Sequence, residues 1–78
     1  MAEKYDYRAL RGFIKEYFGS NSEYAKFLKI SNTALYERLA GNIPFRQTEI
    51  DATARHGDLD GEGVMRLFFT KIVRKSVF

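Results

Sequence analysis

The chain has 78 residues, of which 45% are hydrophobic and 15% aromatic, and it contains no cysteine. This composition predicts one small domain with a packed core, and it excludes a disordered chain, a disulfide framework and a thiolate metal site. No apolar run approaches the roughly 20 residues of a membrane span, and the first residues lack the hydrophobic segment of a signal peptide. We therefore expect a cytoplasmic protein.

The formal net charge of +3 is unevenly distributed along the chain. Residues 1–45 carry seven Lys or Arg and five Asp or Glu, residues 46–62 carry two and five, and residues 63–78 carry four cations and no acid. A basic N-terminal half and a basic C-terminal end suit a polyanion such as DNA. The same charges would also serve an ordinary soluble surface.

A first helix is predicted over residues 7–18, with Asp6 as its N-cap and Gly19 just after its end. Its apolar residues recur at i, i+4, i+7 and i+8, the spacing of a helix with one face in the core. These residues are Leu10, Ile14, Tyr17 and Phe18. The other face carries three cations that either are solvated or touch phosphates: Arg8, Arg11 and Lys15.

Residues 20–42 predict two short helices joined by a tight turn. Ser20 is a good N-cap, and Glu23 follows at the spacing of a reciprocal capping box. Ser31 offers a second N-cap. The residues expected to face inward are Tyr24, Ala25 and Leu28 in the first of these helices and Leu35 and Leu39 in the second. Two turns of helix, about three linking residues and two further turns are the helix-turn-helix arrangement, whose second helix enters the DNA major groove.

The residues from Asn21 to Leu35 also follow a known family pattern. A polar residue opens the first helix, an aromatic residue, Ala25 and Leu28 follow, and Ile30 comes after the turn. This segment resembles the helix-turn-helix of the phage repressor and Cro class. The wider chain is similar to small Cro-like regulators from phages of Gram-positive bacteria. The matches outside the motif are Tyr5-Asp6-Tyr7, Leu10-x-Gly12-x-Ile14-x-Glu16-x-Phe18-Gly19, Glu49-Ile50 and Phe68-Phe69-Thr70-Lys71-x-Val73.

Two positions depart from the family pattern. Lys29 stands in the turn, where glycine is usual, and a left-handed lysine there would cost about 1 kcal/mol, so the turn is expected to differ slightly in shape. Arg38 stands near the end of the second helix, where an apolar residue is usual. We expect Leu39 to take over its packing.

The segment after the motif predicts a loop and a fourth helix. Pro44 cannot continue a helix, so residues 43–45 form a loop from which Phe45 folds back into the core. The fourth helix begins at Arg46 or Gln47 and ends at His56. Its inward residues are expected to be Ile50 and Ala54, with Gly57 as its stop. A cation in the last turn favours the helix dipole, which accounts for His56 without a catalytic role.

The acidic run from Asp58 to Glu62 is not a calcium loop. Counted from Asp58, the twelfth position of such a loop would be Phe69 instead of the required bidentate acid. A capped turn leading into a fifth helix over residues 61–68 is predicted instead, with Val64, Leu67 and Phe68 inward. The chain also lacks a nucleophile–base pair, a metal-ligand cluster and a phosphate-binding loop, so we expect no enzyme activity, no cofactor and no metal.

Residues 69–78 are rich in β-branched and aromatic residues. They could form an extended arm that pairs with a second chain, continue the last helix, or lie over the protein's own core. Such a segment is too apolar to be free, so a docking surface is expected. The residues expected to contact a partner are Phe69, Ile72, Val73, Val77 and Phe78.

The sequence therefore predicts an all-α fold, a compact bundle of about five short helices with a central helix-turn-helix and an extended or helical C-terminal tail. A helical wheel with Leu35 and Leu39 inward, together with the family resemblance, assigns base reading to Asn32, Thr33, Tyr36 and Glu37. Contacts to the DNA backbone are assigned to Asn21, Lys29, Ser31, Arg38 and Asn42. The assignments of Glu37 and Arg38 rest on helix geometry alone.

The expected function is a sequence-specific transcription regulator of the phage Cro or repressor type, acting in the host cell. A domain of this size contacts about one half-site, so a homodimer on a roughly palindromic DNA operator is expected. An alternative is an accessory regulator that binds a phage repressor protein, because Glu37 would repel phosphates and the net charge is modest. The sequence leaves both open.

Overall fold

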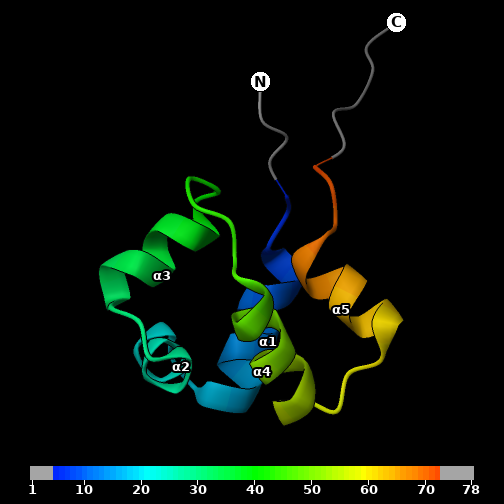
Figure 1. The fold of residues 1–78 in the computed structure, drawn as a ribbon, viewed down its shortest axis with the longest axis horizontal. Helices are drawn as coiled ribbons and strands as arrows, with labels where there is room; N and C mark the ends of the chain where they lie inside the picture. Colours follow the sequence, from blue (N-terminus) through cyan, green and yellow to red (C-terminus); the bar gives the residue numbers. More distant parts are fainter. Residues whose placement is uncertain (1–4, 73–78) are drawn as a thin grey trace, which may run out of the picture.

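The computed structural model describes residues 5–72, which form five α-helices and one isolated antiparallel bridge (Figure 1). The helices are α1 (Arg8–Phe18), α2 (Asn21–Leu28), α3 (Asn32–Leu39), α4 (Gln47–His56) and α5 (Gly61–Phe68). The predicted all-α bundle with a central helix-turn-helix is confirmed, and α1 begins one residue later than predicted. None of the described helices is long and apolar enough to cross a membrane.

Side-chain caps set the start of three helices. The Ser20 hydroxyl accepts a hydrogen bond from the Glu23 amide at 3.2 Å, and the Ser31 hydroxyl accepts one from the Ala34 amide at 3.0 Å. The Asp60 carboxylate does the same for the Gly63 amide at 2.9 Å. Because the first amides of a helix have no partner inside it, these caps fix the boundaries of α2, α3 and α5.

Two predicted caps take a different form. The N-cap residue of α1 is Tyr7, while Asp6 accepts from the backbone amide and the guanidinium of Arg8. These hydrogen bonds with Arg8 lower the pKa of the Asp6 carboxyl. The reciprocal half of the Ser20 capping box is absent, because the Glu23 carboxylate lies 3.4 Å from the ammonium group of Lys26.

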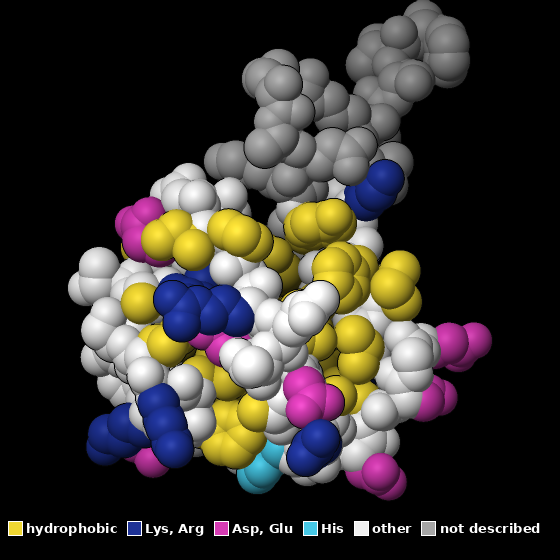
Figure 2. All heavy atoms as spheres, viewed as in Figure 1, with side chains coloured by type: hydrophobic (Ala, Val, Ile, Leu, Met, Phe, Trp, Pro, Cys, Tyr) yellow, Lys and Arg dark blue, Asp and Glu magenta, His cyan; other side chains and the backbone are white. Residues whose placement is uncertain are grey.

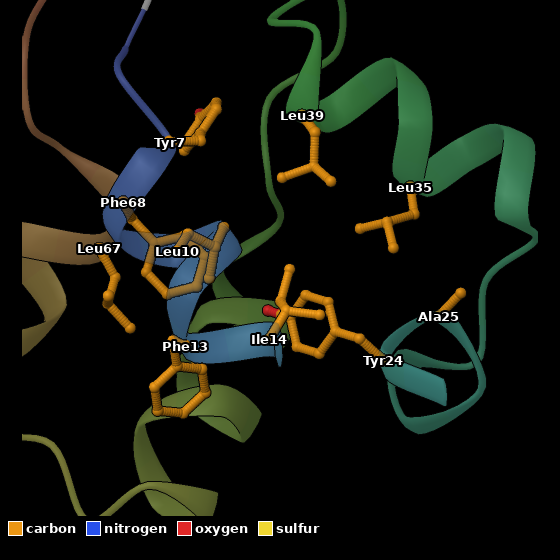
Figure 3. Packing of buried hydrophobic residues seen from close by; sticks show 10 residues of the cluster. All are labelled: Tyr7, Leu10, Phe13, Ile14, Tyr24, Ala25, Leu35, Leu39, Leu67 and Phe68. Atoms are coloured by element: carbon orange, nitrogen blue, oxygen red, sulfur yellow. The ribbon is translucent and has the colours of Figure 1, made fainter. Parts of the chain in front are cut away.

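The core is built around α1, which contributes Leu10, Phe13 and Ile14. Figure 3 shows side chains from the other elements converging on this helix, with Leu67 and Phe68 of α5 on one side and Tyr24 of α2 on the other. The ten buried hydrophobic residues of the described chain are Tyr7, Leu10, Phe13, Ile14, Tyr24, Ala25, Leu35, Leu39, Leu67 and Phe68. Burial of each large side chain favours folding by roughly 1.5–3 kcal/mol.

The inward faces predicted for α1 and α4 are correct only in part. On α1, Tyr17 is 49% exposed, and its ring packs on the ring of Phe13 with the centroids 4.4 Å apart. Phe13 is the buried residue of the two, and its burial was not predicted. On α4, Ile50 is half-buried and packs against the core, as predicted, but Ala54 is only half-buried, and the buried side chains of this helix are Glu49 and Thr53. The physical reason is that both polar side chains of α4 have hydrogen-bond partners, so burying them leaves no polar group unsatisfied.

The loop and the chain ends complete the bundle. As predicted, Phe45 folds back, with its ring 5.4 Å from that of Tyr7 and 5.1 Å from that of Phe68 in edge-on packing. After α5 the chain is extended and pairs with the segment before α1. The Asp6 amide donates to the Thr70 carbonyl, and an antiparallel bridge joins Tyr5 and Lys71.

Residues 69–72 are the described part of the predicted tail, and they form this pairing. This part lies against the protein's own N-terminal segment and does not continue α5. Phe69 and Ile72 are exposed. The other predicted partner contacts, Val73, Val77 and Phe78, lie outside the described residues.

The two glycines near Phe13 should respond oppositely to substitution by alanine. A Cβ at Gly12, inside α1, would meet nothing within 4 Å, so Gly12→Ala should raise the free energy of unfolding by about 0.5–1 kcal/mol. A Cβ at Gly57 would lie 2.7 Å from the Phe13 ring, so Gly57→Ala should lower it by about 1 kcal/mol or more. Thermal unfolding followed by circular dichroism measures both. Equal effects of the two variants would contradict this description of the core.

Candidate nucleic-acid interface

The turn between α2 and α3 consists of three residues, 29–31. Lys29 takes the left-handed conformation itself, with φ 62° and ψ 40°. The Ile30 amide donates to the Ala25 carbonyl at 3.0 Å, which closes the end of α2. The backbone thus adopts the conformation that glycine usually supplies, at a cost of about 1 kcal/mol, and the lysine side chain is exposed at the turn.

The outward face of α3 is polar. Asn32, Thr33 and Tyr36 are exposed, and 67% of Tyr36 is accessible. Leu35 and Leu39 on the opposite face are buried, as predicted. Four of the predicted features of this helix therefore occur together: a polar start, two buried leucines, an outward Thr33 and an outward aromatic residue.

Two of the predicted reading residues have partners within the protein. Asn32 donates through Nδ2 to the Ser22 hydroxyl at 3.1 Å, so α2 orients the Asn32 amide. Glu37 is half-buried and accepts from Nδ2 of Asn42 at 3.1 Å. A base contact by either side chain would have to replace or share these hydrogen bonds.

The prediction that Arg38 contacts the DNA backbone is wrong. Its exposed fraction is 4%, and its guanidinium forms a bidentate pair with Glu49 of α4, with Nε–Oε1 2.8 Å and Nη2–Oε2 3.0 Å. Nη1 donates to the Ala34 carbonyl at 3.1 Å. Every guanidinium nitrogen thus has a partner inside the protein. As predicted, Leu39 takes the apolar place next to it.

The buried side of α4 holds both helices of the motif. Oε1 of Glu49 also accepts from the Arg46 backbone amide at 3.0 Å. One turn further along α4, Thr53 donates to the Glu49 carbonyl at 2.8 Å and lies 2.7 Å from the hydroxyl of Tyr24. Since the Thr53 proton is already used, Tyr24 is the donor of that second bond. Glu49 therefore anchors α3, and Thr53 anchors α2.

Burial of the Tyr24 ring raises the pKa of its phenol to about 12, although the hydrogen bond to Thr53 acts in the opposite direction. The phenol is therefore neutral at physiological pH and can donate to Thr53. No buried side-chain nitrogen or oxygen of the described residues lacks a hydrogen-bond partner. The buried polar side chains that join α2 and α3 to α4 thus all have hydrogen-bond partners.

The remaining predicted backbone contacts lie at the two ends of α2, at the N-cap of α3 and after α3. Asn21 and Lys29 are exposed, whereas the hydroxyl of Ser31 is engaged in its cap and the amide of Asn42 binds Glu37. All four side chains remain at the surface. Of these four, Asn21 and Lys29 therefore have no side-chain hydrogen bond or ion pair with another residue of the described chain.

Arg11 of α1 was predicted only as one of three cations that either are solvated or touch phosphates. It donates through Nη2 to the Leu39 carbonyl at 3.3 Å, at the C-terminal end of α3. With Asn21, Asn32 and Tyr36 it lines a hollow of about 260 Å³ between α1, α2 and α3. Its place on the polar face of α1 was visible in the sequence, but its proximity to α3 depends on how the helices pack.

No group of three or more potential metal ligands occurs among residues 5–72.

The chain belongs to the family described as "Protein of unknown function (DUF739)". The model of that family matches residues 1–71, which include all five helices and the bridge. A comparison with curated proteins finds no match. The function of this DUF739 member is therefore argued from its site.

Removing one partner of the buried ion pair should be strongly destabilising. Arg38→Met leaves the Glu49 carboxylate buried without a cation, and we expect a loss of about 3–5 kcal/mol in the free energy of unfolding. Arg55→Met is the matched control, because it breaks an exposed pair with Asp51, and should cost less than about 1 kcal/mol. Urea unfolding measures both. Similar costs for the two variants would contradict the anchoring role of Glu49.

The raised pKa of the Tyr24 phenol leads us to expect a loss of stability at high pH. Because its pKa rises from 10.0 to about 12 in the folded chain, its contribution is fully present below pH 10 and is lost as the pH rises towards 12. The slope from this group reaches about 1.4 kcal/mol per pH unit. Tyr24→Phe should remove that part of the slope in urea unfolding at several pH values, and the raised pKa of Tyr7 should leave a remainder. Identical slopes for the two proteins would contradict the assignment.

Proposed function

We propose that this chain is a sequence-specific DNA-binding regulator that places α3 in the major groove. The observation that carries the proposal is the exposed polar face of α3, with Asn32, Thr33 and Tyr36 outward on a helix whose other face is fixed in the core. The major groove is about 12 Å wide and admits one α-helix. A rigid helix with polar side chains of this kind is suited to reading base edges.

Each outward side chain has chemistry that fits a base or a phosphate. The Asn32 amide can pair with adenine through N6 and N7, and Thr33 can donate a hydrogen bond or contact a thymine methyl group. Tyr36 offers its hydroxyl to a phosphate or its ring to a methyl group. Glu37 can accept from cytosine N4 if Asn42 releases it.

Contacts to the phosphates are proposed for the side chains around α2. Asn21 opens this helix, whose first amides favour anions. Lys29 at the turn and Arg11 beside the hollow are exposed cations. Such contacts fix register on the duplex but carry no sequence information.

The resemblance to Cro-like phage regulators supports a role in transcription control, as a repressor, in the host cell. A single copy of α3 reads about one half-site, so we propose a homodimer on a palindromic operator with half-sites about 34 Å apart. The dimer would place two α3 helices on one side of the DNA.

Binding to a repressor protein is a second candidate, favoured by the exposure of Tyr36. Large exposed aromatic residues are frequent in the centres of protein interfaces, and Glu37 beside it would be tolerated better by a protein than by phosphates. In that case the residues of α3 would act without DNA.

Alanine variants of α3 test DNA reading. A duplex is first selected with the full chain from a random library. Asn32→Ala and Thr33→Ala should then each reduce the discrimination between the selected duplex and its single-base variants by about 1–3 kcal/mol. Lys29→Gln should weaken selected and scrambled duplexes alike and reduce the salt slope by about 1. Fluorescence anisotropy gives these values.

Thr48→Ala is the matched control, because Thr48 is an exposed threonine on α4. It should leave both affinity and discrimination unchanged. Failure to enrich any duplex, or full discrimination by both α3 variants, would refute the proposed reading of DNA by α3. Protein capture by α3 would then be the candidate to pursue.

A further inference from the structure

A second surface, separate from α3, lies between α1 and α5. It is a groove of about 390 Å³. Its lining includes Gly12, Phe13, Glu16, Tyr17, Leu59 and Arg66. Figure 1 shows α5 at the opposite end of the bundle from α3. The groove is therefore accessible independently of the reading face.

The floor of this groove is open, and apolar side chains form part of it. Gly12 contributes no side chain, and a Cβ there would meet nothing within 4 Å. Tyr17 is half-exposed beside it, and Leu59 and Phe13 add apolar surface. An apolar side chain from outside could rest on this floor against the α1 backbone.

The rims of the groove and of the hollow beside it carry four carboxylates and one cation, Arg66. Glu16 lies on the α1 side, and an adjoining hollow that shares Leu59 and Arg66 is lined by Asp58, Asp60 and Glu62. None of these four carboxylates forms an ion pair within residues 5–72. Figure 2 shows acidic side chains gathered on the side of the molecule where α5 begins. The surface therefore suits a segment that is both cationic and apolar.

The chain contains such a segment. Residues 73–78, Val-Arg-Lys-Ser-Val-Phe, combine two adjacent cations with three apolar side chains and have no acidic side chain. We infer that the groove between α1 and α5 binds residues 73–78 of a second copy of this chain. Arg74 and Lys75 face the acidic rim, and the apolar side chains cover the floor.

Chain length favours the second copy over the chain's own segment. Lys71 lies beside Tyr5, and the antiparallel pairing directs the chain away from α1 (Figure 1). From Tyr5 to Glu16 the distance along the segment and α1 is roughly 20 Å. The four residues from Lys71 to Lys75 cover at most about 14 Å. Since the chain leaves the bridge pointing away from α1, it would have to reverse before its cations could approach Glu16 of the same copy, and four residues are too few for both the reversal and the return.

Reciprocal exchange closes the assembly. If each copy places its segment in the groove of the other, both grooves are filled and a two-fold dimer results. This inference does not rest on DNA binding by α3, since dimerisation is measured without DNA. Its failure would remove the proposed homodimer but not the reading of a half-site by α3, which is measured with DNA.

Charge reversal in two full-length variants tests the inference. One variant carries Glu16→Lys and Glu62→Lys in the groove, and the other carries Arg74→Glu and Lys75→Glu in the segment. Sedimentation velocity over a range of concentrations should show a reversible dimer for the unaltered chain. Dimerisation should weaken more than about tenfold for each variant alone, because like charges then meet. An equimolar mixture of the two variants should recover the dimer, because opposite charges meet again at both contacts.

A groove-filling variant gives an independent readout. Gly12→Gln projects a side chain into the groove, while Gly12→Ala is the matched control that leaves most of the space open. The glutamine variant should dimerise more weakly than the alanine variant, and both should remain folded by circular dichroism. A chain that stays monomeric at every concentration, a dimer indifferent to both charge reversals, or a mixture that stays monomeric would each overturn the inference.

Discussion

The buried ion pair between Arg38 and Glu49 is the interaction on which the geometry of the helix-turn-helix depends. Taking each charge out of water costs several kcal/mol, which only close, complete pairing offsets. Here the pairing is complete: three guanidinium nitrogens have acceptors, and the Glu49 carboxylate receives both Arg38 and the Arg46 amide. An arginine in this position cannot shift without leaving a buried charge alone, so the end of α3 has one arrangement relative to α4.

The bundle combines two kinds of packing. α1 presents an apolar stripe to α2 and α5, whereas α4 presents a polar face whose contacts are directional. Apolar contacts define which helices meet, and the hydrogen bonds of Glu49 and Thr53 define how α2 and α3 sit on α4. A helix held in this way needs little reordering when it binds a ligand, which favours affinity. The acidic groove lies at the other end of the bundle, so the proposed contacts with DNA and with a second copy do not compete.

Local signals allowed most of the fold to be predicted. The caps at Ser20, Ser31 and Asp60 act over three residues, so a reader of the sequence can place the starts of their helices. The inward Leu35 and outward Thr33 follow from helical periodicity. Long-range pairing could not be predicted in this way: Arg38 and Glu49 are eleven residues apart, and charged residues are expected at the surface unless a partner is known. For the same reason, the burial of Glu49 and Thr53 on α4 was not predicted, and only Ile50 and Ala54 were expected to face inward.

A titration of the ¹⁵N-labelled full chain with its selected DNA duplex, followed by amide chemical shifts, tests the proposed reading of DNA most directly. The account predicts that the largest shifts fall on Asn32, Thr33 and Tyr36 and on the start of α2, while the amides of α5 and the acidic groove stay unchanged. Unchanged amides throughout α3 at saturating DNA, or shifts centred on the groove between α1 and α5, would contradict it.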